Sequence, residues 1–155
     1  MENLSKVFAG ATQAAGPLDC VTQLPEDWRL ARAAHVDLLL MGLPRVNVLL
    51  IGMDRVIWSL LEALRPDLRE PVVSWYPGRR LVLPASGATG TMVLQDVGGL
   101  TPEDQMRLFD WLDRNSGRMQ VISTTSTPLL PRVQAGTFID MLYYRLNTVC
   151  VDVLA

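Results

Sequence analysis

From residue 46 onward, apolar residues form two kinds of pattern, continuous runs and runs with helical spacing. Residues 46–52, VNVLLIG, are almost entirely apolar, rich in β-branched side chains, and end at glycine. Such a run predicts a parallel strand that is covered on both faces of its sheet. Residues 56–64 then repeat apolar side chains at helical spacing, and Pro66 follows them. A strand, a glycine and a helix in succession are typical of an α/β domain.

The same alternation continues to the end of the chain. Further strands are predicted at 72–76, 81–83, 91–95, 119–123 and 148–154, and most of 129–147 is predicted to be helical. Another helix begins after Thr101, which fits an N-cap because proline and two acidic residues follow it. The Pro77-Gly78 pair between the first two of these strands predicts a hairpin near residues 72–83. We therefore expect a three-layer α/β/α fold around a mainly parallel sheet.

The first 45 residues give weaker signals. Residues 1–23 are rich in Ala, Gly and Thr without a clear period, and we expect a peripheral segment there, either a short helix or a loop. Pro25 and the two acidic residues after it are typical of a first helical turn, and a broad apolar face continues to Met41. A length of 155 residues fits one domain over 1–155.

Composition excludes several classes of function. The net charge is −2, only Lys6 among the 14 basic residues is a lysine, and no basic cluster is longer than Arg79-Arg80, so we expect no direct DNA binding. Charged residues interrupt every apolar run before it reaches the length of a membrane span, which predicts a cytoplasmic protein without membrane contact. Cys20, Cys150 and His35 do not form a zinc motif, so we expect no metal and two reduced thiols.

Two segments carry a resemblance to a known family. Residues 136–147, GTFIDMLYYRLN, resemble the GxFRxDLYYRLN segment of the AAA+ domain of sigma-54-dependent transcriptional activators, also called the sigma-54 interaction domain. Residues 90–100, GTMVLQDVGGL, are similar to GTLFLDEVGEL of that family, and the helix after them matches QxRLL. The resemblance extends over about residues 46–153. It implies a P-loop NTPase-like (AAA+) fold with a five-stranded sheet in the order 5-1-4-3-2.

The segment aligned with the family's phosphate loop lacks the residues that bind a triphosphate. Such loops use glycines to wrap backbone amides around phosphate, a lysine to neutralise it, and Ser or Thr to bind magnesium. Here residues 52–59, from Gly52 to Ser59, read GMDRVIWS, so only the first glycine survives, and Trp58 stands in place of the lysine. Arg55 offers a positive charge in a turn that has no further glycine. We therefore expect no bound ATP or magnesium.

The family's other catalytic groups are also changed. Its Asp-Glu pair, which holds magnesium and polarises water, reads Gln95-Asp96 here, and Ser126 replaces a sensor asparagine. Arg145 aligns with an arginine that acts on a neighbouring subunit's nucleotide, although the residue also suits helix packing. The resemblance further implies that the GAFTGA surface loop and the helical lid are missing, and we expect no DNA-binding domain.

These losses predict a degenerate domain that is not an enzyme. We expect a regulatory or assembly module in bacterial transcription control that contacts a protein, either an AAA+ activator or a second copy of itself. The candidate interface is Trp75, Tyr76, Arg79 and Arg80, since aromatic residues beside arginine are enriched in interfaces, while packing of the two aromatic residues on the sheet edge is the alternative. Two other functions stay open: an ATP-binding ATPase domain that is active only with an intact partner, and a small-ligand sensor whose cleft lies around Met53 and Trp58.

Overall fold

The computed structural model describes residues 46–115 and 117–153. Within them, five parallel strands form one sheet in the order β2-β3-β4-β1-β5. This is the order 5-1-4-3-2 read from the other edge, so the expected fold is confirmed. The strands are β1 (Val48–Gly52), β2 (Val72–Trp75), β3 (Gly90–Leu94), β4 (Met119–Thr125) and β5 (Val149–Val153). The predicted N-terminal segment and the helix over 25–41 lie outside the described residues, as do His35 and Cys20.

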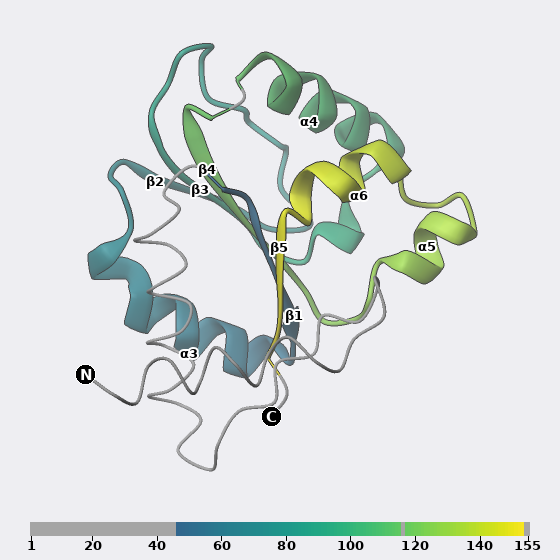
Figure 1. Cartoon of the computed structure of the whole chain (residues 1–155), viewed down its shortest axis with the longest axis horizontal. Helices are drawn as coiled ribbons and strands as arrows, with labels where there is room; N and C mark the ends of the chain where they lie inside the picture. Colours follow the sequence, from purple (N-terminus) through teal and green to yellow (C-terminus); the bar gives the residue numbers. More distant parts are fainter. Residues whose placement is uncertain (1–45, 116, 154–155) are drawn as a thin grey trace, which may run out of the picture.

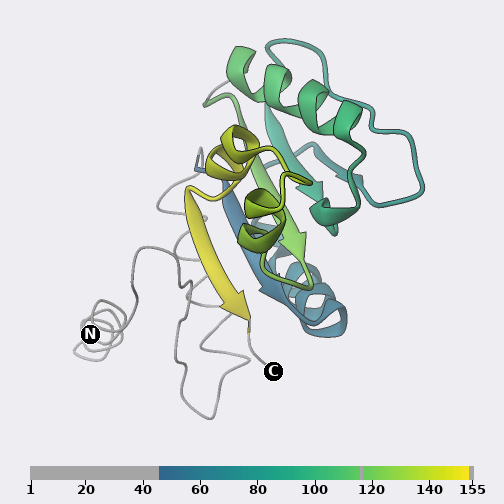
Figure 2. The same ribbon diagram turned by 90° about the vertical axis from the view of Figure 1, so that its right-hand side faces the viewer.

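Helices cover both faces of the sheet, which gives the three expected layers (Figures 1 and 2). Helix α3 (Asp54–Leu64) lies on one face and is followed by the short helix η1 (Arg65–Asp67), which contains Pro66. The other face carries α4 (Pro102–Arg114), α5 (Leu130–Gln134) and α6 (Asp140–Leu146), together with η2 (Val97–Gly99). Thr101 is the N-cap of α4, because its hydroxyl accepts a hydrogen bond from the Asp104 amide at 3.1 Å.

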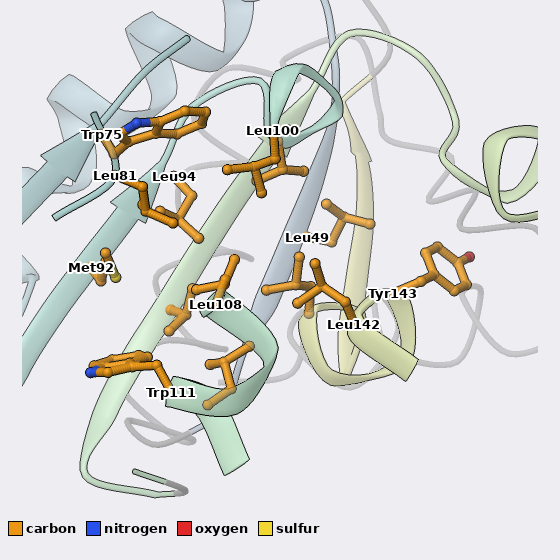
Figure 3. Packing of buried hydrophobic residues seen from close by; sticks show 14 of the residues in the cluster. Leu49, Trp75, Leu81, Met92, Leu94, Leu100, Leu108, Trp111, Leu142 and Tyr143 are labelled. Carbon is orange, nitrogen blue, oxygen red and sulfur yellow. The ribbon is translucent and has the colours of Figure 1, made fainter. Parts of the chain in front are cut away.

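The alternation of side chains along each strand divides the core into two clusters. On β1, Val48 and Leu50 pack with the apolar side of α3, whereas Leu49 points to the opposite cluster with α4 and α6. Figure 3 shows this second, larger cluster, in which Leu108 and Trp111 of α4 lie near strand residues and Leu142 of α6 lies near Leu49. A sheet that is packed on both sides accounts for the nearly continuous apolar strand sequences.

The predicted hairpin over 72–83 is wrong. β2 pairs only with β3, in parallel, and residues 81–83 form no strand. The Pro-Gly pair does form a turn, but the chain after it crosses to the α4 face, where Leu81 is fully buried. Side chains of α4 and of Asn115, the residue after it, bind this backbone in place of a neighbouring strand. The three contacts are Arg107 Nη2 to Leu81 O (3.2 Å), Trp111 Nε1 to Pro84 O (2.8 Å), and Gly87 N to Asn115 Oδ1 (3.1 Å).

Two further findings concern the cysteines and the membrane. Cys150, on β5, is disulfide-bonded, which contradicts the expectation that both cysteines are reduced thiols. Across the described ranges, no helix is both long enough and apolar enough to span a membrane.

Candidate functional site

A cavity of about 460 Å³ opens at the edge of the sheet where the parallel strands end. Ligand sites of open α/β sheets occur at this edge. The cavity brings together four of the residues singled out in the sequence as nucleotide-site positions, while Gly52, Ser59 and Ser126 do not line it. Its lining residues are Asp54, Arg55, Ile57, Trp58, Leu61, Tyr76, Pro77, Gln95, Asp96 and Thr124.

The connection between β1 and α3 is too short to form a phosphate cradle. β1 ends at Gly52 and α3 begins at Asp54, so Met53 is the only residue between them. The amides of Val56 and Ile57 both donate to the Met53 carbonyl, at 2.9 and 3.0 Å. Backbone amides at a helix start bind anions only when they lack another acceptor. The bond from Ile57 is the first regular bond of the helix, so the helix starts directly after Met53 and leaves no loop to wrap around a phosphate.

Gly52 has a structural role that does not involve phosphate. A Cβ atom at this position would lie 2.4 Å from the carbonyl oxygen of Val153 on β5. Real Cβ atoms do not come this close to backbone oxygen, so the residue must be glycine for β1 and β5 to pair here. The one glycine shared with the family's phosphate loop is thus explained by strand packing.

Trp58 and Ser59 are neighbours on α3, but only Trp58 lines the cavity. Trp58 lines the cavity with 53% of its surface exposed, so its indole forms a wall and does not fill the space. The Ser59 hydroxyl instead donates to the Arg55 carbonyl at 3.0 Å, a bond within the helix. No lysine stands among the described residues of this cavity, and Arg55 is the one cation that lines it.

Gln95 and Asp96 form the opposite wall at the end of β3. Asp96 has φ 45°, a left-handed conformation that aspartate tolerates better than most residues, and its amide donates to Thr124 Oγ1 at 3.0 Å. The backbone amide of Gln95 donates to Trp75 O at 2.9 Å. Within the described ranges, the Asp96 carboxylate has no ion-pair or hydrogen-bond partner, and the residue lines the cavity. Ser126 is exposed, just after the end of β4.

Arg145 lies in the last turn of α6 and joins that helix to α4. Its guanidinium binds the Asp113 carboxylate at 2.6 Å, and its backbone carbonyl accepts a hydrogen bond from Asn47 Nδ2 at 2.9 Å. Both side chains of the ion pair are exposed, so the pair stabilises the fold only weakly. Arg145 therefore has a structural contact in this chain, at the end of the sheet where β1, β4 and β5 begin.

The residues proposed for an interface occupy different environments. Trp75 is only 5% exposed and belongs to the core, and its indole Nε1 donates to Arg79 O at 2.8 Å. Tyr76, Arg79 and Arg80 are exposed, and the Arg79 guanidinium stacks 4.6 Å from the centre of the Tyr76 ring. The structure thus favours core packing for the tryptophan and surface display for the other three side chains.

Sequence reasoning gave no role to Gln105, which the structure places at a junction of three segments. Its side chain is buried, its Nε2 donates to Leu100 O and Thr137 O at 3.2 Å each, and its Oε1 accepts from Ile139 N at 2.9 Å. A signal was present, because Gln105 lies on the same helical face as Leu108 and Leu112. A polar residue on an apolar face predicts a buried hydrogen-bonding group.

Comparisons with solved structures show the same fold. The structure is similar to NtrX from Brucella abortus in complex with ATP, with a TM-score of 0.64 and 16% identity over 98% of this chain and 42% of NtrX. It is also similar to the P-loop NTPase domain of the sigma-54 transport activator from E. coli, with a TM-score of 0.54 and 19% identity over 86% of this chain and 99% of that domain. No curated protein sequence matches the chain.

These likenesses concern the fold, and the chain spans about two fifths of the length of NtrX. The sequence match is more specific, since residues 79–155 match the family described as the sigma-54 interaction domain. That range contains β3, α4, β4, α6 and β5. The C-terminal half of this chain, residues 79–155, therefore belongs to the sigma-54 interaction domain family.

Proposed function

We propose that this chain is a non-catalytic member of its family, a regulatory or assembly module that acts by contact with another protein. The observation that carries the proposal is the junction of β1 and α3, where a single residue separates the strand from the helix. The amides of Val56 and Ile57 are bonded to Met53 O at this junction. A loop that wraps backbone amides around a triphosphate needs several residues between strand and helix, and one residue is too few.

The charges in the cavity support the same proposal. Asp54 and Asp96 bring two carboxylates to the lining, against the single guanidinium of Arg55. A triphosphate entering this cavity would meet net negative charge in a partly enclosed space, where repulsion is stronger than in bulk water. Gln95 also lacks the carboxylate through which the family holds magnesium, so metal binding would not offset this repulsion.

Calorimetric titration with ATP and magnesium tests the proposal. We expect no heat of binding at micromolar to millimolar ATP and no phosphate release, while NtrX from Brucella abortus, crystallised with ATP, serves as the positive control. Saturable binding of ATP by this chain, or phosphate release above that of buffer, would contradict the proposal.

The size of the cavity favours a second candidate function, the binding of a small ligand other than a nucleotide. A volume of about 460 Å³ lies within the range of small-molecule sites, and the half-exposed Trp58 leaves that volume open. A fragment screen by ligand-observed NMR tests this candidate, with Trp58→Ala as the matched variant. Fragments that bind the unaltered chain but not Trp58→Ala would support this candidate function. A screen that finds no such fragment would exclude it.

A further inference from the structure

The loop over residues 76–82, called here the 76–82 loop, is held in place at both ends. Before it, Trp75 is buried and its indole donates to Arg79 O at 2.8 Å. After its tip, Leu81 is fully buried and its carbonyl accepts from Arg107 Nη2 at 3.2 Å. The loop is thus fixed by core side chains although its tip is exposed.

Two further features fix the shape of the tip. Gly78 has φ +88°, which glycine adopts without strain, and the Arg79 amide closes the turn on Tyr76 O at 3.3 Å. The ring of Pro77 packs against η2, where a Cβ on Gly99 would lie 2.9 Å from Pro77 Cγ. A loop with these contacts loses little conformational freedom when it binds.

The side chains that this tip presents are basic and apolar. Val82 is 74% exposed, which is the largest exposure among the big apolar side chains of the described residues. Arg79 and Arg80 are exposed and form no ion pair in the part of the chain that the structure describes. Stacking on Tyr76 orients the Arg79 guanidinium and leaves its N–H groups available in the plane of the fork.

We propose that the 76–82 loop binds an acidic protein segment, with carboxylates on Arg79 and Arg80 and an apolar side chain on Val82. A planar guanidinium matches a carboxylate in two parallel hydrogen bonds, and pre-orientation by an aromatic ring lowers the entropic cost of forming them. Val82, exposed two residues after Arg80, adds an apolar contact. This inference rests on the protein-contact part of the proposed function and names the chemistry of the partner.

A peptide fits this surface better than a nucleic acid or a membrane. Two arginines neutralise few phosphates, and the chain as a whole carries a net charge of −2, which repels a polyanionic backbone or an anionic bilayer. Short-range pairing with one or two carboxylates is less affected by this long-range repulsion, because salt screens distant charges.

Fluorescence anisotropy with a labelled peptide tests the proposal on the full chain. The probe has glutamates on both sides of a central leucine, and the matched probe has glutamines in their place. We expect saturable binding of the glutamate peptide that weakens with salt, and a loss of about tenfold or more in affinity for the double variant Arg79→Gln/Arg80→Gln. Val82→Ser should reduce the affinity several-fold. Arg69→Gln removes an exposed arginine outside the loop and should leave the affinity unchanged.

Four results would overturn the proposal. Three of them are the absence of binding by the unaltered chain, equal binding of the glutamine peptide, and equal loss in Arg69→Gln and in the double variant. Preference for duplex DNA or for vesicles of anionic lipid over the peptide would also overturn it. The nucleotide titration is independent of these results, so a chain that binds the peptide and also binds ATP would contradict the proposed function alone. Melting curves of all variants show whether the fold is retained.

Discussion

Gly52 matches a residue of the family's phosphate loop, but the structure gives it a different role. The residue matches the first glycine of a phosphate loop, yet it must be glycine because a Cβ atom would collide with the Val153 carbonyl on the neighbouring strand. Sequence reasoning identified the residue correctly and had no means of seeing its cause. The contact joins residues far apart in the chain, and only the register of β1 with β5 reveals it.

Gly52→Ala should therefore destabilise the fold without any ligand present. Because the added Cβ must displace the edge strand β5, we expect a loss of about 2–3 kcal/mol or more in the free energy of unfolding. Urea denaturation followed by circular dichroism measures it. Gly78→Ala is the matched control, since its added Cβ meets nothing within 4 Å and only the positive φ is strained, at about 1 kcal/mol. Equal stability of Gly52→Ala and the unaltered protein would contradict this explanation.

Ser123 gives a second test at this scale. Its hydroxyl is fully buried on β4 and finds no hydrogen-bond partner among the described residues. Burial of an unpaired hydroxyl is unfavourable, so Ser123→Ala should raise the free energy of unfolding by about 1 kcal/mol. Thr124→Val, next to it, removes the acceptor of the Asp96 amide and should lower stability by about as much. Thermal melts of both variants measure the difference, and a loss in Ser123→Ala comparable to that in Thr124→Val would refute the assignment.

At the scale of elements, patterns local in sequence predicted local structure well. The runs at β1, β3 and β4 and the helical spacing of α3 and α4 each depend on one segment and its neighbours, and these elements are confirmed. The hairpin is wrong for the opposite reason. The turn at Gly78 is local and real, but the path after it is decided by the buried Leu81 and by side chains of α4 that are distant in sequence. Loop paths of this kind depend on tertiary contacts.

A prediction about the start of α3 separates two possible causes of the expected lack of nucleotide binding, the changed side chains and the backbone. If the losses at Trp58 and Gln95 were the whole reason for a lack of nucleotide binding, the variant Trp58→Lys/Gln95→Asp would regain it. We expect that this variant still binds no ATP, because the connection between β1 and α3 stays one residue long and cannot wrap a phosphate. Calorimetry with ATP and magnesium measures it, and Trp58→Lys alone serves as the control for charge. Micromolar binding by the double variant would show that side chains alone are responsible.

For the whole molecule, the position of the candidate site was predictable from the sequence. Its full set of lining residues and its size were not. The resemblance to the family assigned Arg55, Trp58, Gln95 and Asp96 to one nucleotide site, and they line one cavity where the ends of parallel strands meet. The participation of Tyr76 and Pro77 in that cavity depends on the path of the 76–82 loop, which sequence reasoning predicted incorrectly. Trp58 lines the cavity with half of its surface exposed, a placement that no sequence pattern specifies.

Backbone amide NMR in the presence of saturating ATP and magnesium tests the central claim most directly. The relevant signals are the amides of residues 53–57 together with those of Gln95 and Asp96, on the two walls of the cavity. We predict that none of these signals shifts in a saturable manner, and that the amides of Val56 and Ile57 keep the slow hydrogen exchange of bonded groups. Saturable shifts of the 53–57 amides together with those of Gln95 and Asp96 would show a nucleotide held between strand and helix, and would contradict the account.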